Sequence, residues 1–317
     1  SHERAALLNG AFGHALDYDD TFAAFPLHPT TVVVPAALAA AELVADEQGA
    51  AVDGEHLLRA YVAGVEVLHR VGTSVFPTQY RRGFHSTAAV GPLGAAAAAG
   101  VVLGVDRGTL RRALGVAASR AGGLRRNFGT TTKPLHAGFA ASAGFGAAVL
   151  AREGATADRD ILDGPAGYGR AMAGDDYDPS ALDGADLRGV EDVALKLYPS
   201  AHITHGAVEA VRQVRAETGL TPEDVTAVRA TVHPGAEDVL HDRVPTDGLA
   251  AKFSLPYCLA ATLATGDLGL AAFADERVAG TSEAALSAVR VEYDADAVAD
   301  LGRYGARVVV ETAGARH

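Results

Sequence analysis

The stretch at residues 86–103, STAAVGPLGAAAAAGVVL, decides the fold class of this 317-residue chain. Its side chains are small and apolar, so a helix made from it can approach its neighbours closely. The whole chain has the same bias, because hydrophobic residues make up 49%, aromatic residues only 6%, and Trp is absent. A core of Ala, Val, Leu and Gly therefore predicts tightly packed helices.

Helical patterns lie on both sides of this stretch. We expect helices at residues 35–49, 53–75, 110–121 and 134–153, with Asp53 and Asp106 as N-caps of the second and third. Together with residues 86–103 they make five helices joined by short connections that contain Gly. This pattern predicts a helical domain over residues 1–185.

The composition changes at residues 174–189, which are polar and rich in turn-forming residues. Beyond them we expect helices at residues 205–218 and 255–264, and strands at residues 225–233, 289–293 and 307–312 that pair antiparallel. The expected fold class is therefore mainly α with a smaller α+β domain at residues 186–317.

The net charge and the cysteine content argue against several classes of partner and cofactor. The net charge of −12 at pH 7 argues against nucleic acid as a partner, although a local basic pocket can still bind an anionic substrate. One cysteine, Cys258, is too few for an internal disulfide, a Cys-rich zinc site or an iron–sulfur cluster. We find no apolar run of about 20 residues, so we expect no membrane partner and a cytoplasmic location.

Lysine is rare in this chain. Of 27 basic residues only Lys133, Lys196 and Lys252 are lysines, and the others are arginines. An ammonium group can shift its pKa and transfer protons, which a guanidinium essentially cannot do. Each lysine is therefore a candidate functional residue, although three surface lysines could also remain by chance.

The first polar motif is HALDYDDT at residues 14–21, followed by HPT at residues 28–30. It holds three carboxylates within four residues, which repel one another and need donors or cations nearby. Two interpretations stay open. The aspartates either form turns and cap a helix, or a carboxylate such as Asp17 orients a histidine at the rim of a pocket.

The second motif, RRGFHST at residues 81–87, places His85 before the small-residue helix. A helix N-terminus attracts anions and favours a neutral imidazole. Arg81 and Arg82 beside it predict a corner that binds a carboxylate. The alternative is that Ser86 only caps the helix and both arginines are solvated.

The third motif, NFGTTTKPLHAG at residues 127–138, places Lys133 before a helix that we expect to begin at Pro134. The lysine and the free N–H groups of that helix would both bind a carboxylate. The fifth motif, AKFSLPYC at residues 251–258, likewise places Lys252 and Tyr257 at the start of a helix.

The fourth motif, KLYPSAHITH at residues 196–205, holds a lysine, a tyrosine and two histidines within ten residues. The i, i+3 spacing of His202 and His205 lets them share a face and could ligate a metal. No acidic residue is placed as in known zinc motifs, so we expect no metal.

The motifs in this order resemble the MmgE/PrpD family over nearly the whole chain. The strings are HALDYDDT…HPT, RRGFHSTAAVGPLGAAAAA, FGTTTKPLHAGFAA, KLYPSAHITH and AKFSLPYCLAATL. The resemblance implies a large helical domain, an α+β lid domain, a homodimer and no cofactor. The chain departs from the family at Ala201, where a cysteine is usual, and we expect it to lack outer segments at both ends.

The resemblance also implies the site residues. Residues expected to be catalytic are His85, His28, Asp17, Lys133, Lys196, His202 and Tyr257. Of the residues expected to bind substrate, Thr21 is likewise implied by the resemblance. Arg81, Arg82 and Lys252 are expected to bind substrate from their residue type and position in the motifs. His205 is also expected to bind substrate, and the choice between His202 and His205 for the catalytic role stays open.

Family members include 2-methylcitrate dehydratases, cis-aconitate decarboxylases and iminodisuccinate epimerases, which all act at or beside a carbon that bears a carboxylate. We expect a cofactor-independent dehydratase (hydro-lyase) of a small hydroxylated di- or tricarboxylate, which abstracts a proton next to a carboxylate. Decarboxylation or epimerisation in the same pocket is the alternative. A carboxylate-binding protein without catalysis and a His/Asp metal hydrolase are the alternatives from other classes.

Overall fold

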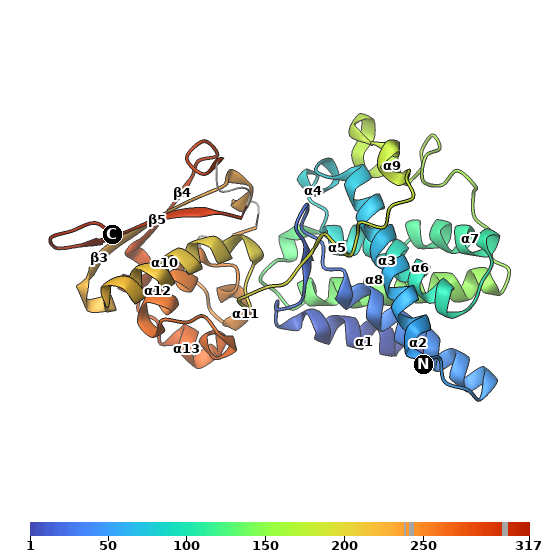
Figure 1. The fold of residues 1–317 in the computed structure, drawn as a ribbon, viewed down its shortest axis with the longest axis horizontal. Helices are drawn as coiled ribbons and strands as arrows, with labels where there is room; N and C mark the ends of the chain where they lie inside the picture. Colours follow the sequence, from blue (N-terminus) through green and yellow to red (C-terminus); the bar gives the residue numbers. More distant parts are fainter. Residues whose placement is uncertain (238, 241–243, 300–303) are drawn as a thin grey trace. The chain divides into compact units, whose positions relative to one another are not determined.

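The computed structural model describes residues 1–237, 239–240, 244–299 and 304–317. The chain divides into two compact units (Figure 1). The boundary expected at residues 185/186 lies shortly before Lys196, where the longest segment of the second unit begins. Unit 1 comprises Ser1–Ala15, Asp19–Asn127 and Thr132–Leu195, and unit 2 comprises Leu16–Tyr18, Phe128–Thr131 and Lys196–His317.

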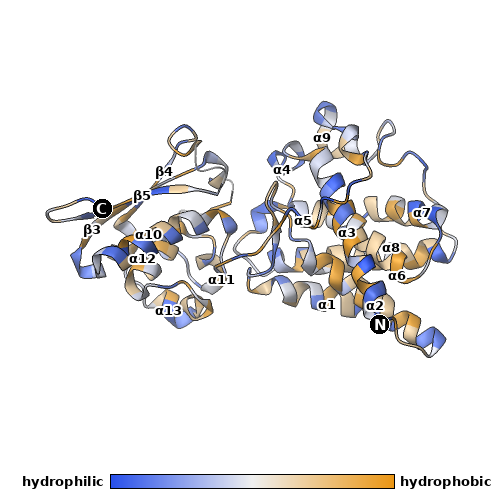
Figure 2. Ribbon diagram, in the orientation of Figure 1, coloured by the Kyte–Doolittle hydropathy of each residue, from blue (hydrophilic) through white to orange (hydrophobic). Residues whose placement is uncertain are grey.

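Unit 1 is helical, and two apolar helices, α6 (Gly91–Val102) and α8 (Thr132–Arg152), pack against each other at its core (Figure 2). Around them pack α1 (His2–Ala15), α2 (Thr30–Gln48), α3 (Gly54–Val75) and α7 (Arg107–Ala118). The shorter elements are α4 (Thr78–Arg81), α5 (Ser86–Ala89), α9 (Tyr168–Ala173) and the antiparallel strands β1 (Thr21–Phe22) and β2 (Val193–Ala194).

Small residues bring α6 and α8 into close contact. A Cβ added to Gly144 of α8 would lie 2.3 Å from the Cβ of Ala95 and 2.5 Å from the carbonyl oxygen of Pro92, both on α6. Neither distance leaves room for a methyl group. The prediction of tightly packed helices is therefore confirmed.

The predicted helix at residues 86–103 is two helices, because α5 ends at Ala89 and α6 begins at Gly91. Pro92 in the first turn of α6 has no N–H to continue the hydrogen bonding of α5. The N-caps are confirmed: Asp53 accepts a hydrogen bond from the backbone N–H of His56 at 2.8 Å, and Asp106 from that of Thr109 at 2.7 Å.

Other boundaries in unit 1 differ from the predictions. Helix α1 was not predicted, α2 begins at Thr30 with Pro35 inside it, and α8 begins at Thr132 rather than at Pro134. Among the described helices, α8 alone is long and apolar enough to cross a membrane, so the expectation of no such apolar run was wrong. However, 67% of its apolar window is buried inside the protein, as in the core helix of a helical domain.

Unit 2 contains a three-stranded sheet in the order β4-β3-β5. Strand β5 (Ala306–Thr312) pairs antiparallel with β3 (Val225–Val232), as predicted, whereas β4 (Val289–Tyr293) pairs parallel. The prediction for β4 was wrong because the long connection from β3 carries several helices and returns the chain to the start of β3. The helices are α10 (His205–Thr218), α11 (Gly248–Ala251), α12 (Leu255–Thr265), α13 (Asp275–Ala279) and α14 (Glu283–Ser287).

Helix α10 packs against β5, and α12 packs against β4 and α10. Alternate residues of β3, Val228, Ala230 and Val232, are buried in the same core as Val208 of α10 and Leu259 of α12. The fold is therefore mainly α with a smaller α+β unit, as predicted.

Candidate active site

Five buried basic side chains gather in unit 1, and we call them the histidine cluster: His14, His28, His85, Lys133 and His136. None of them is more than 7% exposed. His14 is the penultimate residue of α1, His28 lies just before α2, His85 precedes α5, and Lys133 and His136 lie in the first turns of α8. The helices that form the core of unit 1 therefore also bring the cluster together.

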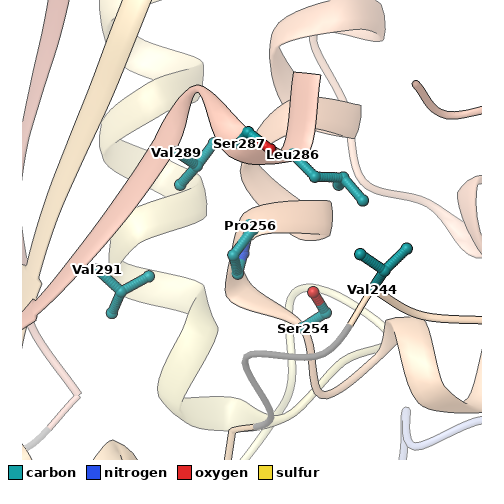
Figure 3. Close-up of a pocket in the computed structure, with 7 residues that line it drawn as sticks. All are labelled: Val244, Ser254, Pro256, Leu286, Ser287, Val289 and Val291. Carbon is teal, nitrogen blue, oxygen red and sulfur yellow. The ribbon is translucent and has the colours of Figure 1, made fainter. Parts of the chain in front are cut away.

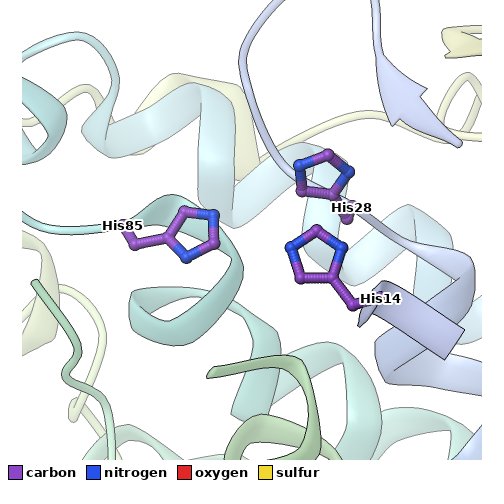
Figure 4. Close-up of side chains that lie close together, drawn as sticks. All are labelled: His14, His28 and His85. Atoms are coloured by element: carbon purple, nitrogen blue, oxygen red, sulfur yellow. The ribbon is translucent and has the colours of Figure 1, made fainter. Parts of the chain in front are cut away.

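Three imidazoles of the cluster face one another (Figure 4). The ring centroids of His14 and His28 are 4.3 Å apart, and the centroid of His85 is 6.2 Å from each of them. One nitrogen from each ring lies within 4.8 Å of the other two.

His14 joins a carboxylate to a lysine. Its Nδ1 lies 2.7 Å from Oδ2 of Asp19, and its Nε2 lies 3.0 Å from Nζ of Lys133. An ionised carboxylate only accepts hydrogen bonds, so Nδ1 carries the hydrogen and donates it. In the neutral ring Nε2 then has the lone pair, which accepts a hydrogen bond from the Lys133 ammonium group.

The tautomer of His28 follows in the same way. Its Nδ1 lies 2.9 Å from the backbone carbonyl oxygen of Asp20, which can only accept. Nδ1 is therefore the donor, and the neutral ring has its lone pair on Nε2, where it can act as a base.

His85 and His136 are held neutral at pH 7. Burial, followed by the charge of Lys133, lowers the pKa of His85 well below its usual value. Burial also lowers the pKa of His136 to about 4. Their Nδ1 atoms are 3.0 Å apart, so one donates and the other accepts. The neutral His85 that the sequence predicted is thus explained by burial, since α5 has only four residues.

The contacts of His14 and Lys133 bear on metal binding. His14, His28 and His85 offer three ligand atoms of the kind that zinc prefers. However, both ring nitrogens of His14 already bond Asp19 and Lys133, and the ammonium of Lys133 places a positive charge beside these rings. The arrangement fits a lysine cation better than a metal ion.

Each aspartate of the first motif has its own partner. Asp17 forms an ion pair with Lys196, and Asp19 bonds His14. Asp20 accepts hydrogen bonds from the hydroxyl and, at 3.1 Å, from the backbone N–H of Thr30 at the start of α2, while burial raises its pKa. Both interpretations of the motif therefore apply, because Asp20 bonds the first residue of α2 and Asp19 orients an imidazole. The orienting role expected for Asp17 stays a prediction.

Unit 2 holds a second group, which we call the Lys196 cluster: Asp17, Lys196, His202 and His205. The Lys196 ammonium also donates to the carbonyl of Asp17 at 3.0 Å. Asp17 has a φ of 50°, in the left-handed region that few non-glycine residues adopt. Nδ1 of His202 and Nε2 of His205 are buried and have no hydrogen-bond partner among the described residues.

Burial is the largest influence on both histidines of the Lys196 cluster. It lowers the pKa of His202 to about 4, with a further contribution from the charge of Lys196. It lowers the pKa of His205 to about 3, with further contributions from His202 and Lys196. Both rings are therefore neutral at pH 7.

Other predicted residues have structural contacts. The guanidinium of Arg82 donates to the carbonyls of Ala171 (2.6 Å) and Met172, near the C-terminal end of α9 where carbonyls lack helical partners. These bonds give Arg82 a structural contact, and Arg81 is exposed at the end of α4. The arginine corner stays a prediction. The hydroxyl of Thr21 donates to the carbonyl of Leu27 at 3.2 Å.

Lys252 and Tyr257 also bond backbone carbonyls within unit 2. The Lys252 ammonium donates to the carbonyl of Pro199 at 2.7 Å and lies 4.2 Å from the centre of the Phe273 ring. The Tyr257 hydroxyl donates to the carbonyl of Ala272, and burial raises the pKa of Tyr257. These contacts hold both side chains within unit 2, and the roles expected for them toward a substrate stay predictions.

Three residues with these contacts were not among the predicted site residues: His14, Asp19 and His136. All three lie inside the motifs, His14 and Asp19 in the first and His136 in the third. The spacing of Lys133 and His136, three residues apart on one helix, was a usable signal. No sequence signal indicated the pairing of His14 with Asp19, because this pairing depends on where α1 ends.

Unit 2 also contains a cavity of about 310 Å³ (Figure 3). Its described lining consists of Val, Leu, Pro and Ser residues of α12, α14, β4 and nearby loops, including Val244, Ser254 and Pro256. This lining offers no acid, base or cation for chemistry on a carboxylate. The histidine cluster is the better candidate active site.

Comparison with known proteins agrees with the motifs. Residues 1–180 match the MmgE/PrpD N-terminal domain, and residues 198–316 match the MmgE/PrpD C-terminal domain. The chain is 33% identical over 302 residues to a cis-aconitate decarboxylase of Homo sapiens, in a match that covers 92% of this chain and 62% of the human protein.

Similar relatives come from other organisms. A cis-aconitate decarboxylase of Mus musculus is 34% identical, over 86% of this chain and 57% of its own length. One of Aspergillus terreus is 28% identical, over 86% of this chain and 59% of its own length. The chain thus spans about 60% of the length of these relatives. On the two domain matches, the chain belongs to the MmgE/PrpD family.

Proposed function

We propose that this chain carries a cofactor-independent lyase activity of the MmgE/PrpD type, and that its reaction is loss of CO₂ from a small unsaturated tricarboxylate such as cis-aconitate. The observation that carries the proposal is the buried group of imidazoles around the Lys133 ammonium, of which His85 and His136 are neutral at pH 7. The names of the relatives support decarboxylation over the dehydration that the motifs alone suggested.

The chemistry of the substrate explains why such a cluster is needed. In cis-aconitate two carboxylates lie on the alkene carbons, and the third lies on a saturated carbon next to the alkene. When the third leaves as CO₂, the electrons of the broken C–C bond form a new double bond, and those of the old double bond move to a carbon that bears a carboxylate. That carbon then takes one proton, which completes the reaction.

The transient carbanion places a second negative charge on its carboxylate group. A fixed cation in a site shielded from water stabilises this charge, and we assign that role to Lys133. Transfer of the proton requires a group next to the carbon, and we assign it to the cluster through His85 and His28. Such a transfer contributes roughly 10²–10⁴-fold to the rate.

We also propose that the Lys196 cluster and the other residues predicted from the sequence contribute to the site. Lys196 pairs with Asp17 and has neutral histidines nearby, so it is a second candidate cation for a carboxylate. A homodimer is likewise proposed only from the family resemblance.

The test is ¹H NMR of the protein with cis-aconitate and with hydroxylated tricarboxylates such as 2-methylcitrate, offered separately. We expect cis-aconitate to give CO₂ and a dicarboxylate with a terminal CH₂= group. Loss of water from the hydroxy acids without CO₂ release would favour dehydration instead. No change in any of these acids at protein concentrations near 0.1 mM would contradict a lyase of this class.

A further inference from the structure

His14 is a member of the histidine cluster that has a polar partner at each ring nitrogen and no role predicted from the sequence. It is 1% exposed, and it stands between the Asp19 carboxylate and the Lys133 ammonium. Because the imidazole ring is rigid and bonds a carboxylate at one nitrogen and an ammonium at the other, fixing the carboxylate also fixes the position from which the ring accepts the ammonium hydrogen.

The Asp19 carboxylate is itself fixed. Its Oδ2 accepts a hydrogen bond from the Thr31 hydroxyl at 3.1 Å, and Nδ1 of His28 lies 3.3 Å from the same oxygen. Its two oxygens lie 2.9 and 2.7 Å from Nδ1 of His14. The carboxylate therefore holds the hydrogen of His14 on Nδ1 and turns the lone pair of Nε2 toward Lys133.

Lys133 needs such a partner because burial disfavours a charged amine. The other titratable groups of the cluster are His85, which precedes α5, His136, which lies on α8, and His28, which precedes α2. These are imidazoles rather than carboxylates. Among the bonds described within unit 1, the carboxylate that this network joins to Lys133 is that of Asp19, which acts through His14.

We propose that His14 is a positioning residue, which together with Asp19 keeps the Lys133 amine protonated and directed into the histidine cluster. The proposal rests on the proposed function in one respect, namely that the Lys133 ammonium faces the carbanion. The pairing itself does not depend on turnover, so it can be tested without a substrate.

The chain offers a direct measurement because it has only three lysines. Protein made with ¹³Cε-lysine gives three side-chain NMR signals, which Lys133→Met and Lys252→Met assign by elimination. The pH at which the Lys133 signal titrates then reports how strongly its proton is held.

Two variants of similar size separate the two bonds of His14. The amide oxygen of His14→Gln reaches toward the position of Nε2 and can still accept from Lys133. His14→Asn reproduces only the donor at Nδ1, and Asp19→Asn removes the charge with almost no change in shape. His56→Gln on α3 is the control outside the cluster.

We expect the titration midpoint of Lys133 to fall by about one pH unit or more in His14→Asn and Asp19→Asn, and by clearly less in His14→Gln. His56→Gln should leave it unchanged. With substrate, kcat should fall more than 10-fold in His14→Asn and recover partly in His14→Gln, and the basic limb of its pH profile should shift with the Lys133 midpoint.

An unchanged Lys133 titration in His14→Asn and Asp19→Asn would overturn the proposal. If His14→Asn fails to fold, the Lys133 titration in the isosteric variant Asp19→Asn is sufficient to test the proposal. A shifted titration in a protein that converts no polycarboxylate would support the positioning role and contradict the proposed function, so the two failures are distinguishable.

Discussion

His85 is 1% exposed and contacts three other members of the cluster, through a hydrogen bond to His136 and ring contacts to His14 and His28. Burial keeps its imidazole neutral at pH 7, so it can accept a proton from a reacting group or return one. A neutral side chain of similar shape would preserve the packing but could not transfer protons.

The first prediction concerns His85→Gln. We expect kcat for cis-aconitate to fall by about 10²–10⁴-fold, the range of one proton-transfer group, with a change in melting temperature of only a few degrees. His56→Gln is the matched control and should keep its kcat. A kcat within about 3-fold of the wild-type value would remove His85 from the mechanism.

The sequence motifs contained most of the cluster but not its pairings. Lys133, His85 and His28 were predicted from residue type and the family resemblance. His14 was missed because its partner could be any of three neighbouring aspartates, and only the end of α1 decides which carboxylate reaches it. The structural contacts of Arg82 were not predicted, because the carbonyls at the end of α9 lie far from it in sequence.

At the scale of elements, α8 positions Lys133 and His136, and its register depends on close packing against α6. Gly144 allows that packing, since a methyl group there would overlap Ala95 and Pro92. Gly146, two residues on, faces only the flexible ends of Arg120 and Glu3, at 3.1 and 3.3 Å. Alanine at position 144 would therefore change both the packing and the helix propensity of α8, whereas alanine at position 146 would change mainly the helix propensity.

The second prediction compares Gly144→Ala with Gly146→Ala. We expect Gly144→Ala to destabilise the protein by about 1–3 kcal/mol through overpacking, measured by urea unfolding. Gly146→Ala should be neutral or stabilise by up to about 1 kcal/mol, because alanine favours a helix. Equal effects of the two substitutions would contradict the close packing of α6 and α8.

The third prediction concerns Arg82→Met. Because its guanidinium bonds carbonyls at the end of α9, we expect a loss of about 1 kcal/mol of stability, with catalytic rate and substrate affinity nearly unchanged. Thermal unfolding and steady-state kinetics on the same preparation measure both. Substrate affinity weakened by about 10-fold or more at unchanged stability would instead restore the substrate-binding role expected from the sequence.

Elements with strong local signals were predicted well, and those set by distant contacts were not. The range of α10 and the N-caps Asp53 and Asp106 follow from local pattern. The parallel pairing of β4 depends on how a long connection returns, which no local pattern encodes. The break at Val90 depends on Pro92, and the prediction of one continuous helix overlooked its effect on α5.

At the scale of the whole molecule, each unit holds two histidines whose pKa is lowered mainly by desolvation: His85 and His136 in unit 1, and His202 and His205 in unit 2. Their folded-state pKa values lie below the usual 6.5, at about 4 for His136 and His202 and about 3 for His205. Below pH 6.5 the unfolded chain therefore binds more protons than the folded chain, and stability falls as the pH falls.

The fourth prediction follows from this sign. Stability should be highest above about pH 6.5 and should decline between about pH 6.5 and pH 3–4, by on the order of 1–3 kcal/mol for each of His136, His202 and His205. Urea unfolding at pH 7.5, 5.5 and 4.5 measures the decline. His136→Gln should make it shallower, and a stability that stays constant over this range would show that these histidines are protonated in the folded protein.

The central claim is that the chain removes CO₂ from a polycarboxylate and delivers one proton to carbon. Turnover of cis-aconitate in D₂O, followed by ¹H and ²H NMR, tests it most directly. We predict a dicarboxylate product with one deuterium on its saturated carbon and none on its terminal CH₂= group, formed at least 100-fold more slowly by His85→Gln. A product without deuterium on the saturated carbon, or no product at all, would contradict the claim.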